Sequence, residues 1–115
     1  MIVGVDVAKA TVVAVVIDRS TKVKESATVT NTKKDLKRFI SRLLQKNTKL
    51  TVASEATAEY HRELVRVCLD QHIPFRLINP IITKQFTRAT VRKKKADLTD
   101  AHIIAKLCLQ GERIR

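Results

Sequence analysis

Two runs of β-branched residues near the start of the chain, only three residues apart, constrain the fold more than any other feature. Ile2–Val7 (IVGVDV) and Thr11–Ile17 (TVVAVVI) each predict a strand. The three residues between them leave room only for a hairpin turn. The more polar, weakly alternating stretch Lys22–Thr30 predicts a third strand. Three successive strands without a helix indicate an antiparallel meander.

Helical periodicity then replaces this alternation. Between Lys33 and Lys46 apolar residues recur at intervals of three and four: Leu36, Phe39, Ile40, Leu43 and Leu44. Thr32, with Asp35 three residues later, resembles a capping box at the start of this helix. Three further helices are predicted. One covers Tyr60–Gln71, and a short one follows Asn79-Pro80, with the asparagine as its cap and the proline as its first residue. The last covers Leu98–Gln110 and is expected to end at Gly111.

Two more strands are predicted between these helices, over Leu50–Ser54 and Phe75–Ile78. Each of them follows a helix, so each is expected to run parallel to a neighbouring strand after a right-handed crossover. The pattern therefore predicts an α/β fold with a mixed five-stranded sheet and helices packed on it. A chain of 115 residues has room for one such domain.

The composition limits the partners and the compartment. The chain has 23 Lys and Arg against 11 Asp and Glu, a net charge of +12, which favours a polyanionic partner, first nucleic acid and then an anionic membrane surface. Asp6 and Lys9 interrupt the apolar start, so it predicts neither a signal peptide nor a membrane span. Two cysteines, Cys68 and Cys108, are too few for a disulfide scaffold and indicate a cytoplasmic protein. Both cysteines and Tyr60 are expected in the core.

Four carboxylates stand out in this basic chain. Asp6 lies within an apolar strand, where an unpaired carboxylate is costly, on the same face as Gly4. Glu55 directly follows the fourth strand, so it shares an edge of the sheet with Asp6 if the first and fourth strands are parallel neighbours. Asp97 and Asp100 start the last helix beside its apolar stripe, and both are expected to lean toward the sheet. Each acid taken singly also fits an ordinary strand-end or helix-cap role.

A run of cations precedes the last two acids. No acidic residue occurs between Asp70 and Asp97, an interval that holds seven Lys and Arg. Most charge runs are solvated surface, but this one adjoins the acids and favours phosphate contact. Carboxylate oxygens suit Mg²⁺ or Mn²⁺, and two such ions about 3.5–4 Å apart can catalyse phosphodiester chemistry. The residues predicted to bind nucleic acid are Lys84, Arg88, Arg92, Lys93, Lys94 and Lys95.

Short motifs carry a resemblance to a known family. They are, in order, Val3–Lys9 (VGVDVAK), Glu55-Ala56-Thr57 with Tyr60, Asn79-Pro80, Lys95-Ala96-Asp97 and Asp100-Ala101. In order and spacing they resemble the N-terminal catalytic domain of the DEDD transposases of bacterial insertion sequences, a group that includes pilin-gene-inverting site-specific recombinases. The resemblance covers nearly the whole chain. It implies a single RuvC-like domain over residues 1–115 with a ribonuclease H-like fold and the strand order 3-2-1-4-5, flanked by helices.

The same resemblance implies a chemistry. Asp6, Glu55, Asp97 and Asp100 would form an acidic tetrad that binds Mg²⁺ (or Mn²⁺), cleaves DNA strands and joins them. The implied partners are DNA, an element-encoded guide RNA in some members, and further copies of the chain in a homo-oligomer. In the family a separate C-terminal domain contributes a serine, and that domain is expected to be absent here.

Other classes of function compete with this one. The leading alternative is a non-catalytic module that binds nucleic acid or dimerises. A Gly-x-Asp strand followed by a hairpin also opens the actin-like nucleotide-binding fold, but the chain has only two glycines, and the Asp97/Asp100 pair is unexplained by that fold. A basic protein of the membrane surface is the least favoured, because packing on the sheet explains the Lys33–Lys46 helix better.

Overall fold

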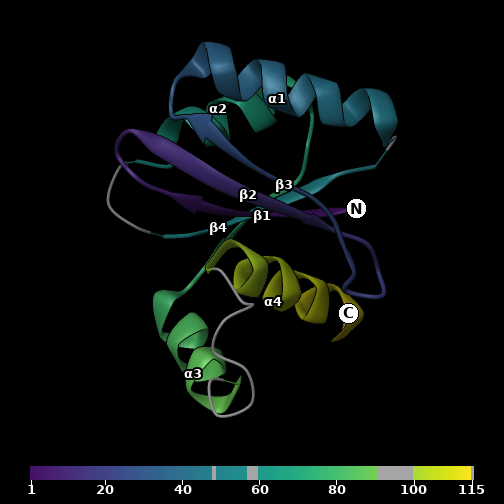
Figure 1. Cartoon of the computed structure of the whole chain (residues 1–115), viewed down its shortest axis with the longest axis vertical. Helices are drawn as coiled ribbons and strands as arrows, with labels where there is room; N and C mark the ends of the chain where they lie inside the picture. The colour runs from purple at the N-terminus through teal and green to yellow at the C-terminus, as the bar shows by residue number, and fades with distance from the viewer. Residues whose placement is uncertain (48, 57–59, 91–99, 115) are drawn as a thin grey trace.

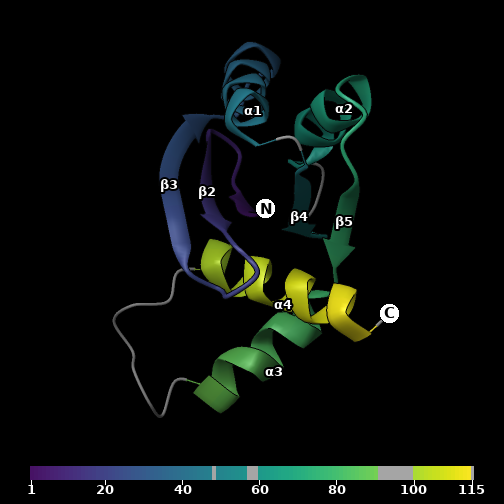
Figure 2. The ribbon, with the colours of Figure 1, turned by 90° about the vertical axis from the view of Figure 1, so that its right-hand side faces the viewer.

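A central sheet separates two layers of helices (Figures 1 and 2). The structure is a computed structural model that describes residues 1–47, 49–56, 60–90 and 100–114. Helices α1 (Lys33–Lys46) and α2 (Arg62–Asp70) cover one face of the sheet. Helix α4 (Asp100–Ile114) covers the other face, and α3 (Pro80–Thr90) lies against the outer side of α4. No helix in the described ranges is both long and apolar enough to cross a membrane.

The sheet confirms the predicted mixed arrangement. It has five strands in the order β3-β2-β1-β4-β5. The antiparallel meander consists of β1 (Ile2–Val7), β2 (Thr11–Ile17) and β3 (Val23–Thr30), and the backbone N–H of Ala8 donates to the carbonyl of Thr11 to close the first turn. Strand β4 (Thr51–Glu55) pairs parallel with β1, and β5 (Phe75–Ile78) pairs parallel with β4.

Each face of the sheet has its own apolar core, because successive side chains of a strand point to opposite faces. Val3, Val5 and Val7 of β1 pack with the buried side of α1 and α2. Ile2 packs in the second core, together with residues of β2, β4 and α4: Val15, Ile17, Ala53, Ala101, Ile104, Ala105, Cys108 and Leu109. Gly4 and Asp6 therefore face α4, as the alternation in the sequence predicts.

The first turns of two helices are capped as predicted. The side-chain oxygen of Thr32 accepts a hydrogen bond from the backbone N–H of Asp35 at the start of α1, which ends at Lys46. Asn79 Oδ1 accepts from the backbone N–H of Ile81 at 2.9 Å, with Pro80 as the first residue of α3. These side chains satisfy N–H groups that have no partner within a first helical turn.

Two local predictions are wrong. Gly111 does not end α4, which continues to Ile114, because this glycine does not adopt the positive φ that ends a helix. Tyr60 is not a core residue: it lies before α2 and is 44% exposed. The prediction for the two thiols is confirmed, since Cys68 and Cys108 are both buried and unbonded to each other.

Candidate functional site

Asp6 and Glu55 lie at the same edge of the sheet. The parallel pairing of β1 with β4 runs up to Val5 opposite Ser54, so the next step along both strands brings Asp6 opposite Glu55. Ala53 packs in the core beneath α4, and Glu55, two residues on, points to that same face. Both acids are half-buried. The predicted convergence of these two acids at the carboxyl edge thus follows from the observed register.

Helix α4 brings a third acid to this edge. Asp100 is its first residue, and the following residue, Ala101, is fully buried against the sheet. Burial, in the first place, and the negative charge of Asp100, in the second, raise the pKa of Asp6 above its ordinary value. The two carboxylates are therefore within electrostatic range of each other. Asp100 itself remains exposed to water at the start of the helix.

Gly4 determines how closely α4 can approach β1. A Cβ atom built on Gly4 would lie 2.1 Å from the carbonyl oxygen of Ala101 and 2.5 Å from the backbone nitrogen of Ala105. Real Cβ atoms do not come this close to backbone atoms, so only glycine allows this packing. The close approach is what places the first turn of α4, with Asp100, beside the strand that carries Asp6.

Asn31 ties together the loops that follow the two acidic strands. Its Nδ2 donates to the carbonyl of Ala8 at 2.8 Å, just beyond β1, and to the carbonyl of Tyr60 at 3.0 Å, beyond β4. Its backbone N–H donates to the carbonyl of Ala10 at 2.9 Å. No local pattern in the sequence predicts this role of Asn31, because its side-chain partners are far from it in the sequence.

The remaining predicted site residues are only partly described. Lys84 is exposed on α3, and Arg88 belongs to the same helix, but its side chain lies outside what is described. Asp97 and the basic residues Arg92, Lys93, Lys94 and Lys95 also lie outside the described ranges. Whether Asp97 joins the other three acids is therefore a prediction.

The described acids have the ligand chemistry of a divalent-cation site, although their grouping is not that of a complete one. Within the described ranges, no group of three or more His, Cys, Asp and Glu residues is arranged to hold a metal ion. Asp6 and Asp100 nevertheless present two negative charges in mutual repulsion, and a cation between them would relieve it. Their oxygens are hard ligands of the kind that Mg²⁺ and Mn²⁺ prefer.

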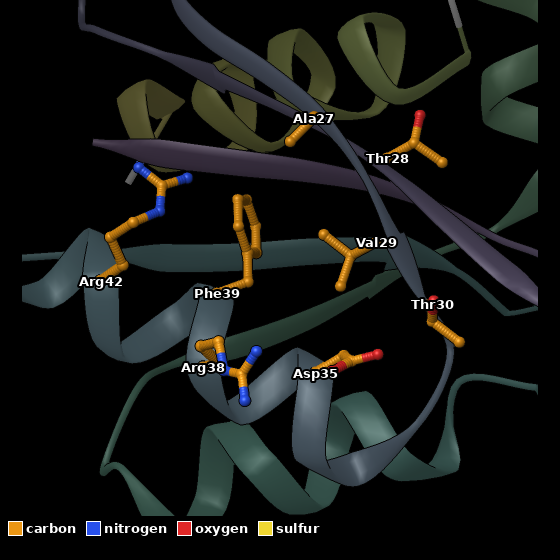
Figure 3. A pocket seen from close by; sticks show the side chains of 8 residues that line it. All are labelled: Ala27, Thr28, Val29, Thr30, Asp35, Arg38, Phe39 and Arg42. Carbon is orange, nitrogen blue, oxygen red and sulfur yellow. The ribbon is translucent and has the colours of Figure 1, made fainter.

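A groove lies away from these acids (Figure 3). Its volume is about 400 Å³, and it runs between β3 and α1, on the other face of the sheet. None of the residues that line this groove belongs to the candidate carboxylate site.

Asn31→Ala is predicted to lower both the stability of the domain and its affinity for metal. The substitution removes the short hydrogen bonds to Ala8 and Tyr60 and a longer one, of 3.5 Å, to the carbonyl of Lys9, so the free energy of unfolding should fall by about 1–2 kcal/mol. The loops after β1 and β4 are no longer held together, so a higher Mg²⁺ concentration should be needed to stabilise the domain. Thermal unfolding with and without Mg²⁺ measures both effects.

The matched control is Asn47→Ala, which removes an amide hydrogen bond to the carbonyl of Leu43 at the far end of α1. An equal Mg²⁺ response in the two variants would contradict the prediction.

The fold is that of the RuvC-like class of ribonuclease H folds. The structure of Thermus thermophilus RuvC in complex with a Holliday junction substrate matches with a TM-score of 0.66, 11% sequence identity, and coverage of 97% of this chain and 94% of that chain. A second Thermus thermophilus RuvC structure matches with a TM-score of 0.64, 12% identity, and coverage of 97% and 95%.

The sequence itself gives the family. The chain belongs to the DEDD transposase family of IS110-type elements, whose family model, described as a transposase, matches residues 3–115. No curated protein matches the chain in sequence. The resemblance in the short motifs is thus confirmed, and the chain is a transposase domain with the fold of a RuvC nuclease.

Proposed function

We propose that this domain cuts and rejoins DNA strands during transposition or site-specific recombination, with Asp6, Glu55, Asp97 and Asp100 as its metal-binding carboxylates. The observation that carries the proposal is that Asp100, on the first turn of α4, lies within electrostatic range of Asp6 at the carboxyl edge of the sheet. Open α/β sheets bind their ligands at this edge. A fold alone would not require two repelling acids there.

The acids have a definite role in this proposal. A bound pair of Mg²⁺ or Mn²⁺ ions would activate the attacking oxygen and stabilise the leaving oxygen of the phosphodiester. Asp6 and Glu55 would hold their side of the site from neighbouring strands, which fixes their separation. Asp100 would close the site from α4, and Asp97 would join it from the segment just before this helix. The cations from Lys84 to Lys95 would contact the phosphates on either side of the scissile one.

DNA is the proposed substrate, and two further partners belong to the proposal. The RuvC structure with its Holliday junction substrate supports a branched DNA as the first substrate to test. Recombination handles two strands together, which favours a homo-oligomer. A guide RNA encoded by the element would select the target in a basic domain of this kind. The proposed compartment is the cytoplasm.

A metal titration tests the proposed function. A cation that binds only the folded site stabilises it by mass action, by about 2.7 kcal/mol at 100 times the dissociation constant, so Mg²⁺ or Mn²⁺ should raise the melting temperature by about 10 °C. NaCl at equal ionic strength is the control, because salt alone screens the +12 charge. The same samples should nick a four-way DNA junction only when the metal is present.

The opposite result has a clear meaning. If neither metal stabilises the domain beyond the NaCl control and no junction is nicked, the four acids do not form a metal site in this chain. The function would then be that of a module that binds nucleic acid or dimerises.

A further inference from the structure

The positive charge of the chain is concentrated in two segments. Helix α1 holds six Lys and Arg and one Asp, a net charge of +5, and residues 84–95 hold six Lys and Arg and no acid. Since the whole chain carries +12, the rest of it is nearly neutral. The part of the second segment that the structure describes, on α3, does not lie beside α1: α1 is on the face of the sheet opposite α3 and α4 (Figures 1 and 2). The basic face of α1 therefore needs an explanation apart from the candidate carboxylate site.

The cations of α1 all point to solvent. The apolar side of the helix is buried, while all six basic side chains are exposed. We call them the α1 surface: Lys33, Lys34, Lys37, Arg38, Arg42 and Lys46. Arg42 pairs with Glu25 and lies over the ring of Phe39. For Lys33, Lys34, Lys37 and Arg38, the described part of the chain shows no ion pair.

The spacing of these cations is unfavourable for an isolated helix. Residues four apart are neighbours on a helix, and like charges at this spacing destabilise it. α1 has four such pairs: Lys33–Lys37, Lys34–Arg38, Arg38–Arg42 and Arg42–Lys46. The neighbouring helix α2 has two cations and two acids, and its Glu63 pairs with Arg66 at 3.1 Å. A helix that only faces water is well served by the balanced charges of α2. The unbalanced positive charges of α1 repel one another, and a bound polyanion would relieve this repulsion.

The groove beside α1 adds hydrogen-bond donors to these charges (Figure 3). Strand β3 is at the edge of the sheet, and Asn31 N–H bonds to the carbonyl of Ala10 just beyond its end. Because antiparallel pairs alternate between bonded and unbonded positions, the backbone N–H groups of Ser26, Thr28 and Thr30 point to the open edge, whereas the carbonyl of Thr30 accepts from the backbone N–H of Thr32. Asp35 lies at the Thr30 end of the groove, where its negative charge disfavours an anion. An anion would therefore bind nearer to Arg38 and Arg42.

We propose that the α1 surface binds the phosphate backbone of a second nucleic-acid segment, on the face of the sheet opposite the candidate carboxylates. The 14 residues of α1 span about 20 Å, the length of about six base pairs. The domain would thus hold two segments at once, one on each face. This inference rests on the proposed function only in taking nucleic acid as the ligand of the domain.

The test compares three triple variants. The first combines Lys34→Gln, Lys37→Gln and Arg38→Gln and removes three positive charges from the α1 surface. Lys22→Gln, Lys24→Gln and Lys49→Gln remove the same charge from exposed positions outside α1. Lys93→Gln, Lys94→Gln and Lys95→Gln remove it from the basic run before α4. Binding to DNA and RNA duplexes of about 30 base pairs is measured by fluorescence anisotropy from about 50 to 200 mM salt, in EDTA so that no cleavage occurs.

The α1 variant is expected to reduce the salt dependence of binding. The slope of log K against log salt should become shallower by about 2–3, with a loss of affinity on the order of 100-fold, while the variant outside α1 changes little. Combining the α1 and the 93–95 variants should give the sum of their separate losses, because the proposal has the two segments bind independently. A larger loss with RNA than with DNA identifies RNA as the ligand of the α1 surface, and the reverse identifies DNA.

Loss of folding cannot imitate this result. Removing like charges from α1 should raise its thermal stability, so the α1 variant must melt at or above the temperature of the native chain. If it binds both duplexes as tightly as the variant outside α1, the proposal is overturned, and an acidic protein becomes the better partner for the surface. Cleavage of the four-way junction is measured separately. If the domain does not cleave DNA, the binding measurements still test the role of the α1 surface.

A cross-linking experiment locates the contact directly. The native thiols are buried, so the cysteine of a Gln45→Cys variant, at an exposed position of α1, can be labelled selectively with a photoreactive group. It should cross-link to the duplex, whereas the same label at Asp70, exposed on α2, should not. Equal cross-linking from both positions would overturn the assignment to α1.

Discussion

Gly4→Ala is expected to lower the melting temperature of the domain by about 10 °C, the largest loss of stability that a single methyl group should cause here. The added Cβ would lie within 2.1 Å of the Ala101 carbonyl oxygen and within 2.5 Å of the Ala105 backbone nitrogen. Both are backbone atoms of α4, so no side-chain rotation can relieve the clash. The helix must move away from β1, and the core between them loses contact. Thermal unfolding followed by circular dichroism measures the effect.

Gly111→Ala is the matched control for this change. Gly111 lies in the same helix, and a Cβ atom there would meet nothing within 4 Å. Alanine is favoured over glycine inside a helix by about 0.5–1 kcal/mol, so this variant should be slightly more stable than the native chain. Gly4→Ala should also lose the stabilisation by Mg²⁺, since the displaced helix carries Asp100 away from Asp6. A Gly4→Ala protein as stable as Gly111→Ala would contradict the observed packing.

Asp6→Asn is expected to abolish DNA cleavage while making the metal-free domain more stable at neutral pH. If Asp6 is a metal ligand, its loss should slow cleavage by at least about 100-fold, because even the outer partners of metal ligands contribute about 10–100-fold. Stability changes in the opposite direction. Burial and Asp100 raise the pKa of Asp6 above its ordinary 3.8, so ionising this carboxyl costs the folded state free energy.

The pH dependence follows from the sign of that shift. A carboxyl with a raised pKa in the folded state favours folding at low pH, and this advantage is lost as the pH rises from about 3.8 through the raised value. The melting temperature of the native chain should therefore fall relative to that of Asp6→Asn between acidic and neutral pH. Mg²⁺ should reverse the order, because only the native chain retains the ligand.

Asp70→Asn serves as the control for this experiment. Asp70 is an exposed acid on α2, on the opposite face of the sheet, so its loss should leave cleavage and the response to Mg²⁺ unchanged. Should Asp6→Asn retain cleavage at the rate of the Asp70 control, Asp6 is not a metal ligand and the proposed site is wrong. A melting temperature below that of the native chain at neutral pH would contradict the account of the pKa.

The strands and their faces could be predicted from the sequence because they depend on local patterns. The alternation of residues around Asp6 predicts that it shares a face of the sheet with Gly4. The helices before β4 and β5 predict that these two strands run parallel to their neighbours. The helix after Thr32 was located by its cap. These features follow from two or three neighbouring residues and from the handedness of crossovers.

Other features could not be predicted, because they depend on residues far apart in the sequence. The hydrogen bonds of Asn31 join three segments, and the sequence pattern shows only an asparagine between a strand and a helix. The sequence places Gly4 on the face of Asp6 but does not show its close contact with Ala101 and Ala105, which lie much further along the chain. Gly111 was misread because a glycine near the end of an apolar pattern is typical of a helix end, whereas α4 continues through it.

The division of the apolar interior into two cores has a consequence for the order in which the protein becomes functional. Synthesis proceeds from the N-terminus, so all five strands, α1 and α2 leave the ribosome before α4 does. The core beneath α1 and α2 can form at that stage, because none of the α4 side chains that the structure describes belongs to it. Asp100 joins Asp6 only when α4 docks on the exposed face of a sheet already built. A growing chain therefore lacks its complete set of carboxylates until this late helix has been made.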